Sequence, residues 1–226
     1  MTNELATFIA GNSLPVLSDE ALANAITEAQ TASGDVARDN NATQFLSFSG
    51  KTGVYALGKG RADIDPSAVY LIEPMSFTDG WICWKSSKPV DRVEWSLLTP
   101  AAAVHQPDLP DHGPYNSKVG EGWSATRGFG CISLDATATQ IKFSTSAVSA
   151  KNAVDDLLNE IKDRSARKEP QIPVVHFERE QFEAQGSKNW KPRFDVEAWV
   201  TRTNAAAYVA GHLSLADLIR GVSSKK

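Results

Sequence analysis

Alternating apolar and polar positions dominate the chain after residue 43, and this pattern predicts β-strands. The segments concerned are rich in β-branched and aromatic residues and are bounded by Gly, Pro, Asn and Ser, as strands usually are. We expect strands at 45–50, 53–58, 68–72, 77–85, 89–98, 123–134, 139–144, 172–182 and 190–200. In the last of these, Phe194, Val196, Ala198 and Val200 are expected on one face, opposite Asp195, Glu197 and Trp199.

Apolar residues at three- and four-residue steps predict three helices. The clearest stripe runs from Ala150 to Ile161, with Ser146 or Ser149 as its expected cap and Pro170 beyond its end. A second helix is expected between Ser18 and Gly34, and a short third one in LSLADLIRGV at 213–222.

The order of these elements predicts a mainly β (α+β) fold. Several strands, one late helix and two closing strands are the order of an OB-like five-stranded Greek-key barrel. We therefore divide the chain into an acidic helical extension with a linker at 1–43, a barrel domain at 44–201, and a C-terminal helix with a basic tail at 202–226. The segment 99–122 holds four prolines and no apolar period, so it is expected to be a long loop.

Composition restricts the setting and the partners. The net charge of the 226 residues is −4, and residues 1–44 carry six acidic residues against Arg38 alone, so the remaining chain sums to +1. A near-neutral body can still present a basic groove. No apolar run has the length of a membrane span and no secretory leader is recognisable, so we expect a cytoplasmic protein that does not enter membranes. Cys83 and Cys131 are expected to be free thiols.

Signatures of catalysis are scarce. GKGR at 58–61 lacks the spacing of a phosphate-binding loop, and no nucleophile motif is present. His105 and His112 with Asp108 and Asp111 could bind a metal, but a solvated acidic turn explains them better. The acidic alternation Glu178, Glu180 and Glu183 fits a solvated strand face better than a nuclease site. We expect no enzyme, no metal and no cofactor.

Tryptophans next to cations supply the positive evidence for a function. Rings that stack on bases, beside cations that meet phosphates, are what single-stranded nucleic acid needs. Strand alternation places Trp81 and Trp84 on opposite faces of the 77–98 hairpin, so at most one of them lies in a given core. The last hairpin repeats the pattern around Trp190. The predicted nucleic-acid contacts are Trp81, Trp84, Lys85, Lys88, Arg92, Lys142, Lys188, Trp190, Lys191 and Arg193, and the two hairpins are expected to border one groove. The alternative is that both Trp81 and Trp84 are covered by other segments.

Two blocks of the chain resemble proteins of tailed phages and prophages. VYLIEPMSFTDGWICWK at 69–85 is similar to their apolar strand, Pro-Met/Phe-Ser step and Gly-Trp/Tyr-Ile-Cys/Ala-Trp strand. Within 149–200, SAKNAVDDLLNEI, PVVHFEREQFEAQ and WKPRFDVEAWV are similar to their helix and two following strands. The resemblance covers 44–201 and implies a replication or recombination protein with an OB-type single-strand binding fold. The chain departs from familiar single-strand binders because it ends in Lys225 and Lys226, not in an acidic tail.

Two hypotheses follow. The first is a phage-encoded single-stranded DNA-binding protein of DNA replication or recombination, with RNA as an alternative ligand. Its further expected partners are phage or host replication and recombination proteins and other copies of the chain. The second is a non-enzymatic phage module that binds and diverts a host protein through the N-terminal helix and the proline-rich loop.

Overall fold

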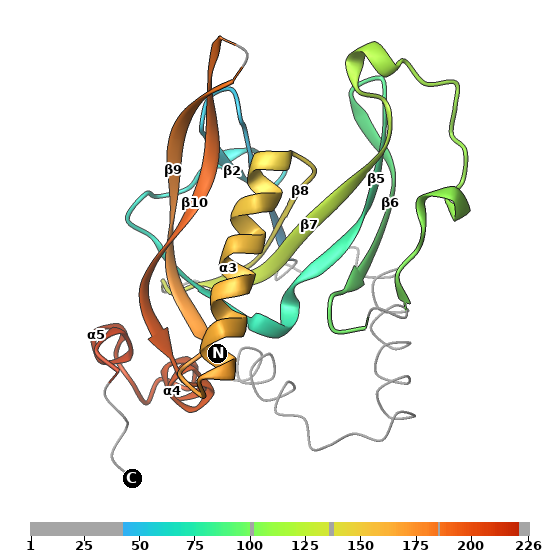
Figure 1. The fold of residues 1–226 in the computed structure, drawn as a ribbon. Helices are drawn as coiled ribbons and strands as arrows, with labels where there is room; N and C mark the ends of the chain where they lie inside the picture. Colours follow the sequence, from blue (N-terminus) through green and yellow to red (C-terminus); the bar gives the residue numbers. More distant parts are fainter. Residues whose placement is uncertain (1–42, 100–101, 136–137, 185, 222–226) are drawn as a thin grey trace.

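Ten strands in the described part of the chain form one curled, open sheet (Figure 1). The computed structural model describes residues 43–99, 102–135, 138–184 and 186–221, and the helix expected from Ser18 lies outside them. The strands are β1 (Gln44–Phe48), β2 (Tyr55–Leu57), β3 (Ala62–Asp63), β4 (Val69–Ile72), β5 (Thr78–Lys85), β6 (Lys88–Ser96), β7 (Gly122–Ser133), β8 (Gln140–Thr145), β9 (Ile172–Ala184) and β10 (Ser187–Val200). The mainly β expectation is confirmed, and each predicted strand is present.

In the described residues, α-helices are fewer than strands and follow β8. They are α3 (Val148–Ala166), α4 (Arg202–Val209) and α5 (Leu215–Ile219), with short 3-10 turns η1 (Pro74–Ser76), η3 (Gln106–Asp108) and η4 (Ser117–Val119). The expected Ser cap of α3 is wrong, because Ala147 is the N-cap and makes no side-chain hydrogen bond. Among the described residues, every helix is too short or too polar to cross a lipid bilayer.

The long strand β7 joins two parts of the sheet. Along one path the order is β10-β9-β4-β7-β8-β1-β2-β3, in which only β1 and β8 are parallel partners. The first half of β7 pairs instead with β5, and β5 pairs with β6. We call β5, β6 and residues 122–128 of β7 the arm, and the strands of the main path the body. The body curls into a half-barrel, so the described fold is larger than the predicted five-stranded barrel.

The core of the body is an aromatic cluster under α3. Phe129 is fully buried, with its ring centroid 5.4 Å from Phe143 and 5.1 Å from Phe194. The apolar face of α3 closes this cluster through Val154 and Leu157. Figure 1 shows α3 lying along β10 and β7, and the predicted apolar stripe of α3 packs against the sheet.

Two glycines, Gly80 and Gly128, allow neighbouring strands to approach closely in the arm and where it joins the body. A Cβ at Gly80 would lie 2.3 Å from the carbonyl oxygen of Val93, and one at Gly128 would lie 2.4 Å from that of Phe143. Real Cβ atoms do not approach backbone so closely, so the strands meet there only because both positions are glycine. The arm diverges from the body, as Figure 1 shows on the right.

A β-bulge changes the predicted faces of β10. The register against β9 shifts between Val196 and Ala198. One extra residue reverses the side on which the following side chains lie. Trp199 therefore packs against the same cluster as Phe194 and Val196, while Ala198 and Val200 join a second cluster with α4 and α5. The prediction that Trp199 lies opposite Phe194 is wrong for this reason.

Candidate nucleic-acid interface

A cleft of about 680 Å³ separates the arm from the body. Ser144 of β8 lines this cleft, and it alternates along the strand with the buried Phe143. The cleft therefore lies on the face of the sheet opposite the aromatic core. We call it the arm cleft. Its lining comes from β1, the facing sides of β5 and β6, one residue of β7 and the end of β8: Phe45, Leu46, Ser47, Phe48, Ile82, Trp84, Pro89, Val90, Asp91, Arg92, Thr126, Ser144, Thr145, Ser146 and Ala147.

Aromatic and apolar groups face solvent in the arm cleft. Phe45 is 55% exposed and Val90 is 48% exposed, while Trp84 is half-buried beside them. Ile82, two residues before Trp84, is buried on the same side of β5. Apolar surface that remains exposed in a concave site is available to a ligand.

The turn of the β5–β6 hairpin brings Trp84 and Arg92 to this cleft. Ser86 and Ser87 have φ values of 51° and 61°, the left-handed pair typical of a tight two-residue hairpin turn. A register shift between Cys83 and Trp84 then places Trp84 opposite Pro89. Lys88, next to that proline, is exposed at the rim.

Two cations lie in or beside the arm cleft, Arg92 on the arm and Lys142 on the body. The guanidinium carbon of Arg92 on β6 lies 5.8 Å from the ring centroid of Phe45 on β1. Lys142 of β8 forms a 2.7 Å ion pair with Glu94 of β6. Arg92 is also 3.7 Å from the other carboxylate oxygen of Glu94. Four predicted contacts, Trp84, Lys88, Arg92 and Lys142, therefore lie in or beside one site.

The other predicted contacts of this hairpin are covered by the proline-rich loop. The indole nitrogen of Trp81 donates to the carbonyl of Val104 at 2.8 Å. The ammonium group of Lys85 donates to the carbonyls of His112 at 2.6 Å and Gly113 at 3.1 Å. Trp81 and Lys85 lie on the face away from the arm cleft, so their role as contacts beside Trp84 is corrected. Their polar groups instead hold 99–122 against the arm.

His112 completes the attachment of this loop. Its Nε2 lies 2.8 Å from the carboxylate of Asp91 on β6, and its backbone N–H donates to the Tyr115 hydroxyl at 2.7 Å.

Desolvation raises the pKa of the Tyr115 phenol, and burial likewise raises the pKa of the Cys131 thiol. In the described part of the chain no group of three or more His, Cys, Asp or Glu side chains is arranged to bind a metal ion.

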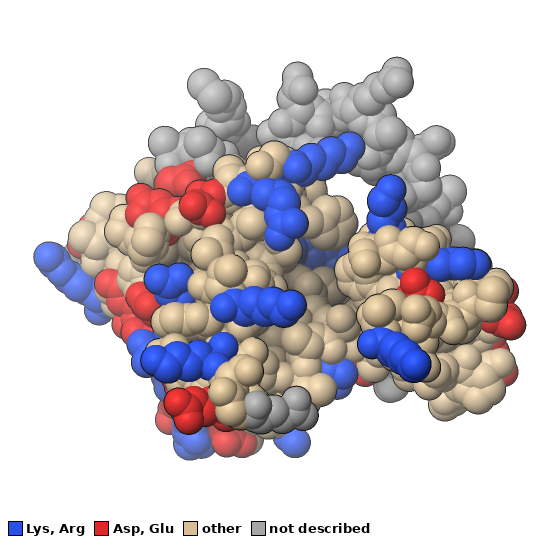
Figure 2. Space-filling view, turned by 90° about the horizontal axis from the view of Figure 1, so that it is seen from above, with Lys and Arg blue, Asp and Glu red and all other residues tan. Residues whose placement is uncertain are grey.

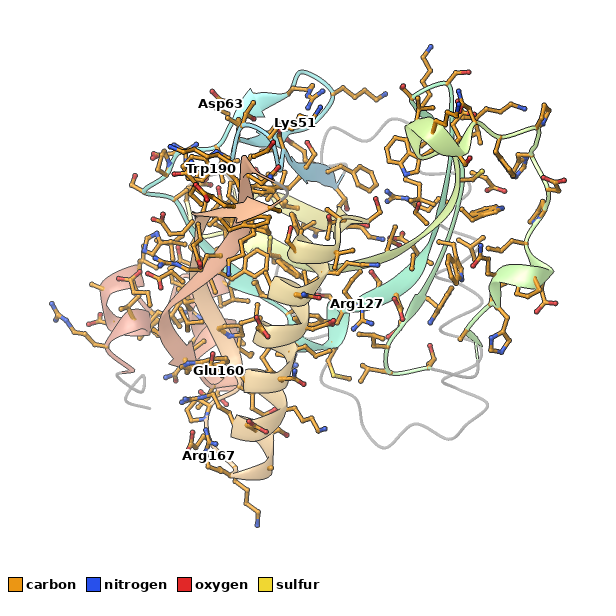
Figure 3. The ribbon with its side chains drawn as sticks, turned by 45° about the horizontal axis from the view of Figure 1, so that its top comes forward. Lys51, Asp63, Arg127, Glu160, Arg167 and Trp190 are labelled. Carbon is orange, nitrogen blue, oxygen red and sulfur yellow. The ribbon has the colours of Figure 1, made fainter. Side chains whose placement is uncertain are left out.

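No described residue of the β9–β10 hairpin lines the arm cleft, so the expectation of one shared groove is wrong. The backbone N–H of Trp190 donates to the carbonyl of Gly50 at 2.8 Å, which ties β10 to the β1–β2 turn. Arg179 lies over the Trp190 ring at 4.9 Å and donates to the carbonyl of Gly53 at 3.0 Å. Figure 3 shows Trp190 beside Lys51 at this end of the body. Trp190 is a structural contact of the curled sheet.

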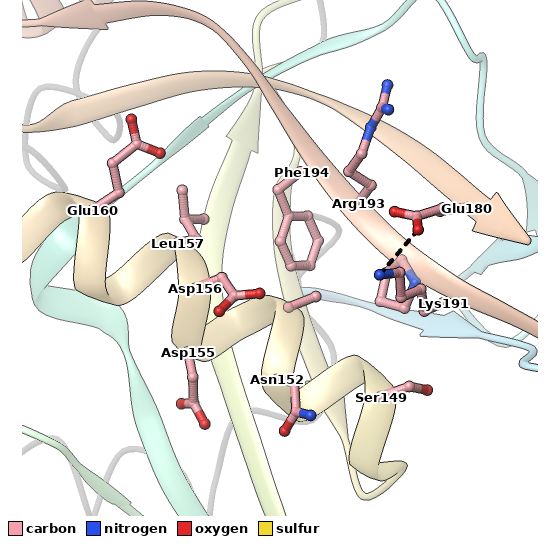
Figure 4. Close-up of a pocket in the computed structure, with 12 residues that line it drawn as sticks. Ser149, Asn152, Asp155, Asp156, Leu157, Glu160, Glu180, Lys191, Arg193 and Phe194 are labelled. Atoms are coloured by element: carbon pink, nitrogen blue, oxygen red, sulfur yellow. Dashed lines mark ion pairs between the residues drawn. The ribbon is translucent and has the colours of Figure 1, made fainter. Parts of the chain in front are cut away.

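Cations of the same hairpin are mostly paired locally. Lys191 lies 3.1 Å from Glu180, and Arg193 lies 3.8 Å from Asp195. Lys188 is exposed near the turn. Lys191 and Arg193 border a separate pocket of about 530 Å³ between β10 and α3, with Phe194 at its centre (Figure 4). The α3 side of that pocket is acidic and includes Asp156 and Glu160, which makes it unsuited to a phosphate backbone.

The charge distribution favours an anionic ligand between arm and body. Figure 2, seen from above, shows Lys and Arg side chains on both lobes around the hollow that separates them. Lys51 on the β1–β2 turn and Lys88 on the β5–β6 turn are exposed on the two sides. Basic groups on both walls raise the local concentration of a polyanion despite the net charge of −4.

Phe45 and Val90 line the arm cleft but were not among the residues predicted from the sequence. Both stand on predicted strands, and Phe45 alternates with the buried Leu46, so its side could have been identified as the outer one. What the sequence lacks is any sign that β1 faces β6 across a cleft, because only the curvature of β7 and its partners brings them together.

Comparisons with protein-family models, with curated proteins and with solved structures found no match.

Proposed function

We propose that the protein binds single-stranded DNA in the arm cleft. The observation that supports this most directly is the combination of Trp84, Phe45 and Arg92 in one solvent-open cleft. Bases would stack on the two rings while Arg92 and Lys88 meet phosphates. Stacking on an aromatic ring is worth about 1–3 kcal/mol per base and tolerates any sequence. Trp84 is half-buried, so only part of its side chain is accessible to such a ligand.

The similarity of 69–85 and 149–200 to phage proteins extends the proposal to phage DNA replication or recombination. Both blocks lie in elements that form the fold: the first covers β4 and β5, and the second covers α3, β9 and β10. RNA is the alternative ligand, since neither stacking nor phosphate contact depends on the sugar. We place the protein in the host cytoplasm on this proposal.

A tryptophan fluorescence titration with oligo-dT at two salt concentrations tests the function. Binding should quench fluorescence and weaken with salt, with a logarithmic slope of about −0.7 per phosphate contact. Two to four such contacts fit the cations that border the cleft. A folded protein that gives no response at low salt would overturn the proposal.

A second candidate is a groove for an apolar segment of a protein partner. The exposed Val90 and Phe45 favour it, because a groove for nucleic acid needs no aliphatic wall. Binding of an apolar fluorescent dye, lost in Val90→Asp, together with no response to oligo-dT, would support this candidate over the first.

A further inference from the structure

Among the described residues, Glu94 is the one carboxylate that contacts both Arg92 and Lys142, the two cations in or beside the arm cleft. It stands on β6 directly opposite Gly80 of β5. A Cβ at Gly80 would lie 3.0 Å from Cγ of Glu94, so the missing side chain leaves room for the Glu94 stem over β5. The carboxylate thereby reaches β8, two strands further along the sheet.

The two oxygens of Glu94 are used unequally. Oε2 accepts a 2.7 Å hydrogen bond from Lys142, whereas Oε1 is buried and accepts none from the described residues. A guanidinium nitrogen of Arg92 lies 3.7 Å from Oε1, beyond hydrogen-bond distance. Arg92 thus lies between Glu94 and the ring of Phe45, and it makes a close hydrogen bond to neither.

A buried acceptor without a hydrogen bond costs free energy, and for a charged group this cost rises when a nearby cation is taken away. The side chain of Glu94 is only 18% exposed, so water screens its charge poorly. A phosphodiester presents the same chemistry as this carboxylate: a delocalised anion with oxygen acceptors. Glu94 therefore occupies the electrostatic position that a phosphate of a bound strand would take.

We propose that Glu94 is an internal competitor for the phosphate groups of single-stranded nucleic acid. This inference rests on the proposed function. In the free protein Glu94 neutralises Lys142 and attracts Arg92. When a strand binds, its phosphate replaces Glu94 as the partner of Arg92. The lost attraction between Arg92 and Glu94 reduces the net free energy of binding. The cleft then binds more weakly, and releases a strand more readily, than its cations alone would dictate.

Replacing Glu94 with glutamine tests the proposal, since the amide keeps the shape and removes the charge. We expect Glu94→Gln to bind oligo-dT about threefold to tenfold more tightly at low salt, with a salt slope steeper by about 0.7 for each cation released. The matched control is Glu180→Gln, which removes a carboxylate from the Lys191 pair on the β9–β10 hairpin and should leave the affinity unchanged. Equal or weaker binding by folded Glu94→Gln would overturn the inference.

A double variant keeps the test decisive if Glu94→Gln does not fold. In Glu94→Gln/Lys142→Gln the two amides can still hydrogen bond across the cleft, while Arg92 loses its competitor. We expect this variant to bind at least as tightly as the wild type, and Lys142→Gln alone to bind about tenfold less tightly because it leaves Glu94 unpaired. A double variant that binds less tightly than the wild type contradicts the inference.

Iodide separates this inference from the proposed function. Quenching of Trp84 by iodide, taken as the difference between each protein and its Trp84→Phe version, reports the local potential without DNA. Greater quenching in Glu94→Gln than in the wild type supports a masked anion site, and equal quenching contradicts it. A wild type that binds no oligo-dT refutes the proposed function, and the iodide result then decides the masking by itself.

Discussion

The guanidinium of Arg92 lies over the ring of Phe45, 5.8 Å from its centroid, and so connects the arm to the body across the cleft. The two residues stand on β6 and β1, strands that never pair. A cation over an aromatic ring is worth about 0.5–1 kcal/mol at an exposed site. The same pair presents a charge and a stacking face to a ligand, which makes it the first target for mutation.

Arg92→Ala should weaken oligo-dT binding about tenfold at low salt and reduce the salt slope by about 0.7, because one phosphate contact is lost. Fluorescence titration at several salt concentrations measures both quantities. Lys191→Ala is the control, since its cation lies outside the arm cleft and is paired with Glu180. An equal loss in both variants would mean that binding is a property of overall charge and not of this cleft.

Arg202→Ala should destabilise the fold by about 2–3 kcal/mol in urea unfolding. Glu73 is 1% exposed, and both its oxygens accept from Arg202, at 2.7 and 3.1 Å. Removing one partner of a fully buried pair costs about 3–5 kcal/mol, and the cost is lower here because Arg202 is 34% exposed. Arg167→Ala, which breaks the solvent-exposed pair with Glu169, should leave the stability nearly unchanged. Equal costs would show that the buried carboxylate is not the cause.

Gly53→Ala should destabilise the protein more than Gly186→Ala does. Both glycines have left-handed φ, +69° and +71°, so backbone strain is common to the two substitutions. At Gly53 the new Cβ would also lie 2.7 Å from Cδ2 of Trp190, whereas nothing lies within 4 Å at Gly186. The difference between the two midpoints of thermal unfolding reports the contacts of this Cβ with Trp190 and with Cδ of Arg179, which would lie 3.0 Å away. If the midpoints coincide, Trp190 does not hold the β1–β2 turn.

Alkaline pH should unfold the protein through its buried phenols. Burial raises the pKa of Tyr70 from 10.0 to about 12, because the phenolate would lose its hydration. Below pH 10 the phenol is protonated in both states and stability is complete. Between pH 10 and about 12 only the unfolded chain ionises, so stability falls as the pH rises. Tyr70→Phe should flatten this part of the stability curve in urea unfolding, and an unchanged curve would exclude Tyr70 as its cause.

Local patterns in the sequence predicted the strands and the main helix, because those depend on neighbouring residues. Alternation correctly separated Trp81 from Trp84. It could not say which one meets solvent, because that depends on the carbonyl of Val104, in a loop whose path has no periodic pattern. The helix α4 went unpredicted because Ala205 and Asn204 give it little apolar contrast.

Long-range contacts determine where the predicted site residues lie. Trp190 between cations has the local features of a nucleic-acid contact, yet a backbone hydrogen bond to Gly50, far away in the sequence, makes it part of the closure of the body. The single extra residue near Glu197 reversed Trp199 in the same way. Phe45 and Arg92 were assigned to separate strands, and only the curvature of the sheet brings them together.

The central claim is that single-stranded DNA binds in the arm cleft and not at the β9–β10 hairpin. The most direct test compares the oligo-dT affinities of Trp84→Ala and Trp190→Ala with that of the wild type at low salt, with circular dichroism to confirm that each is folded. We predict a loss of about tenfold or more for Trp84→Ala, from the loss of stacking, and an affinity within about twofold of the wild type for folded Trp190→Ala. A folded Trp84→Ala protein with wild-type affinity would contradict the claim.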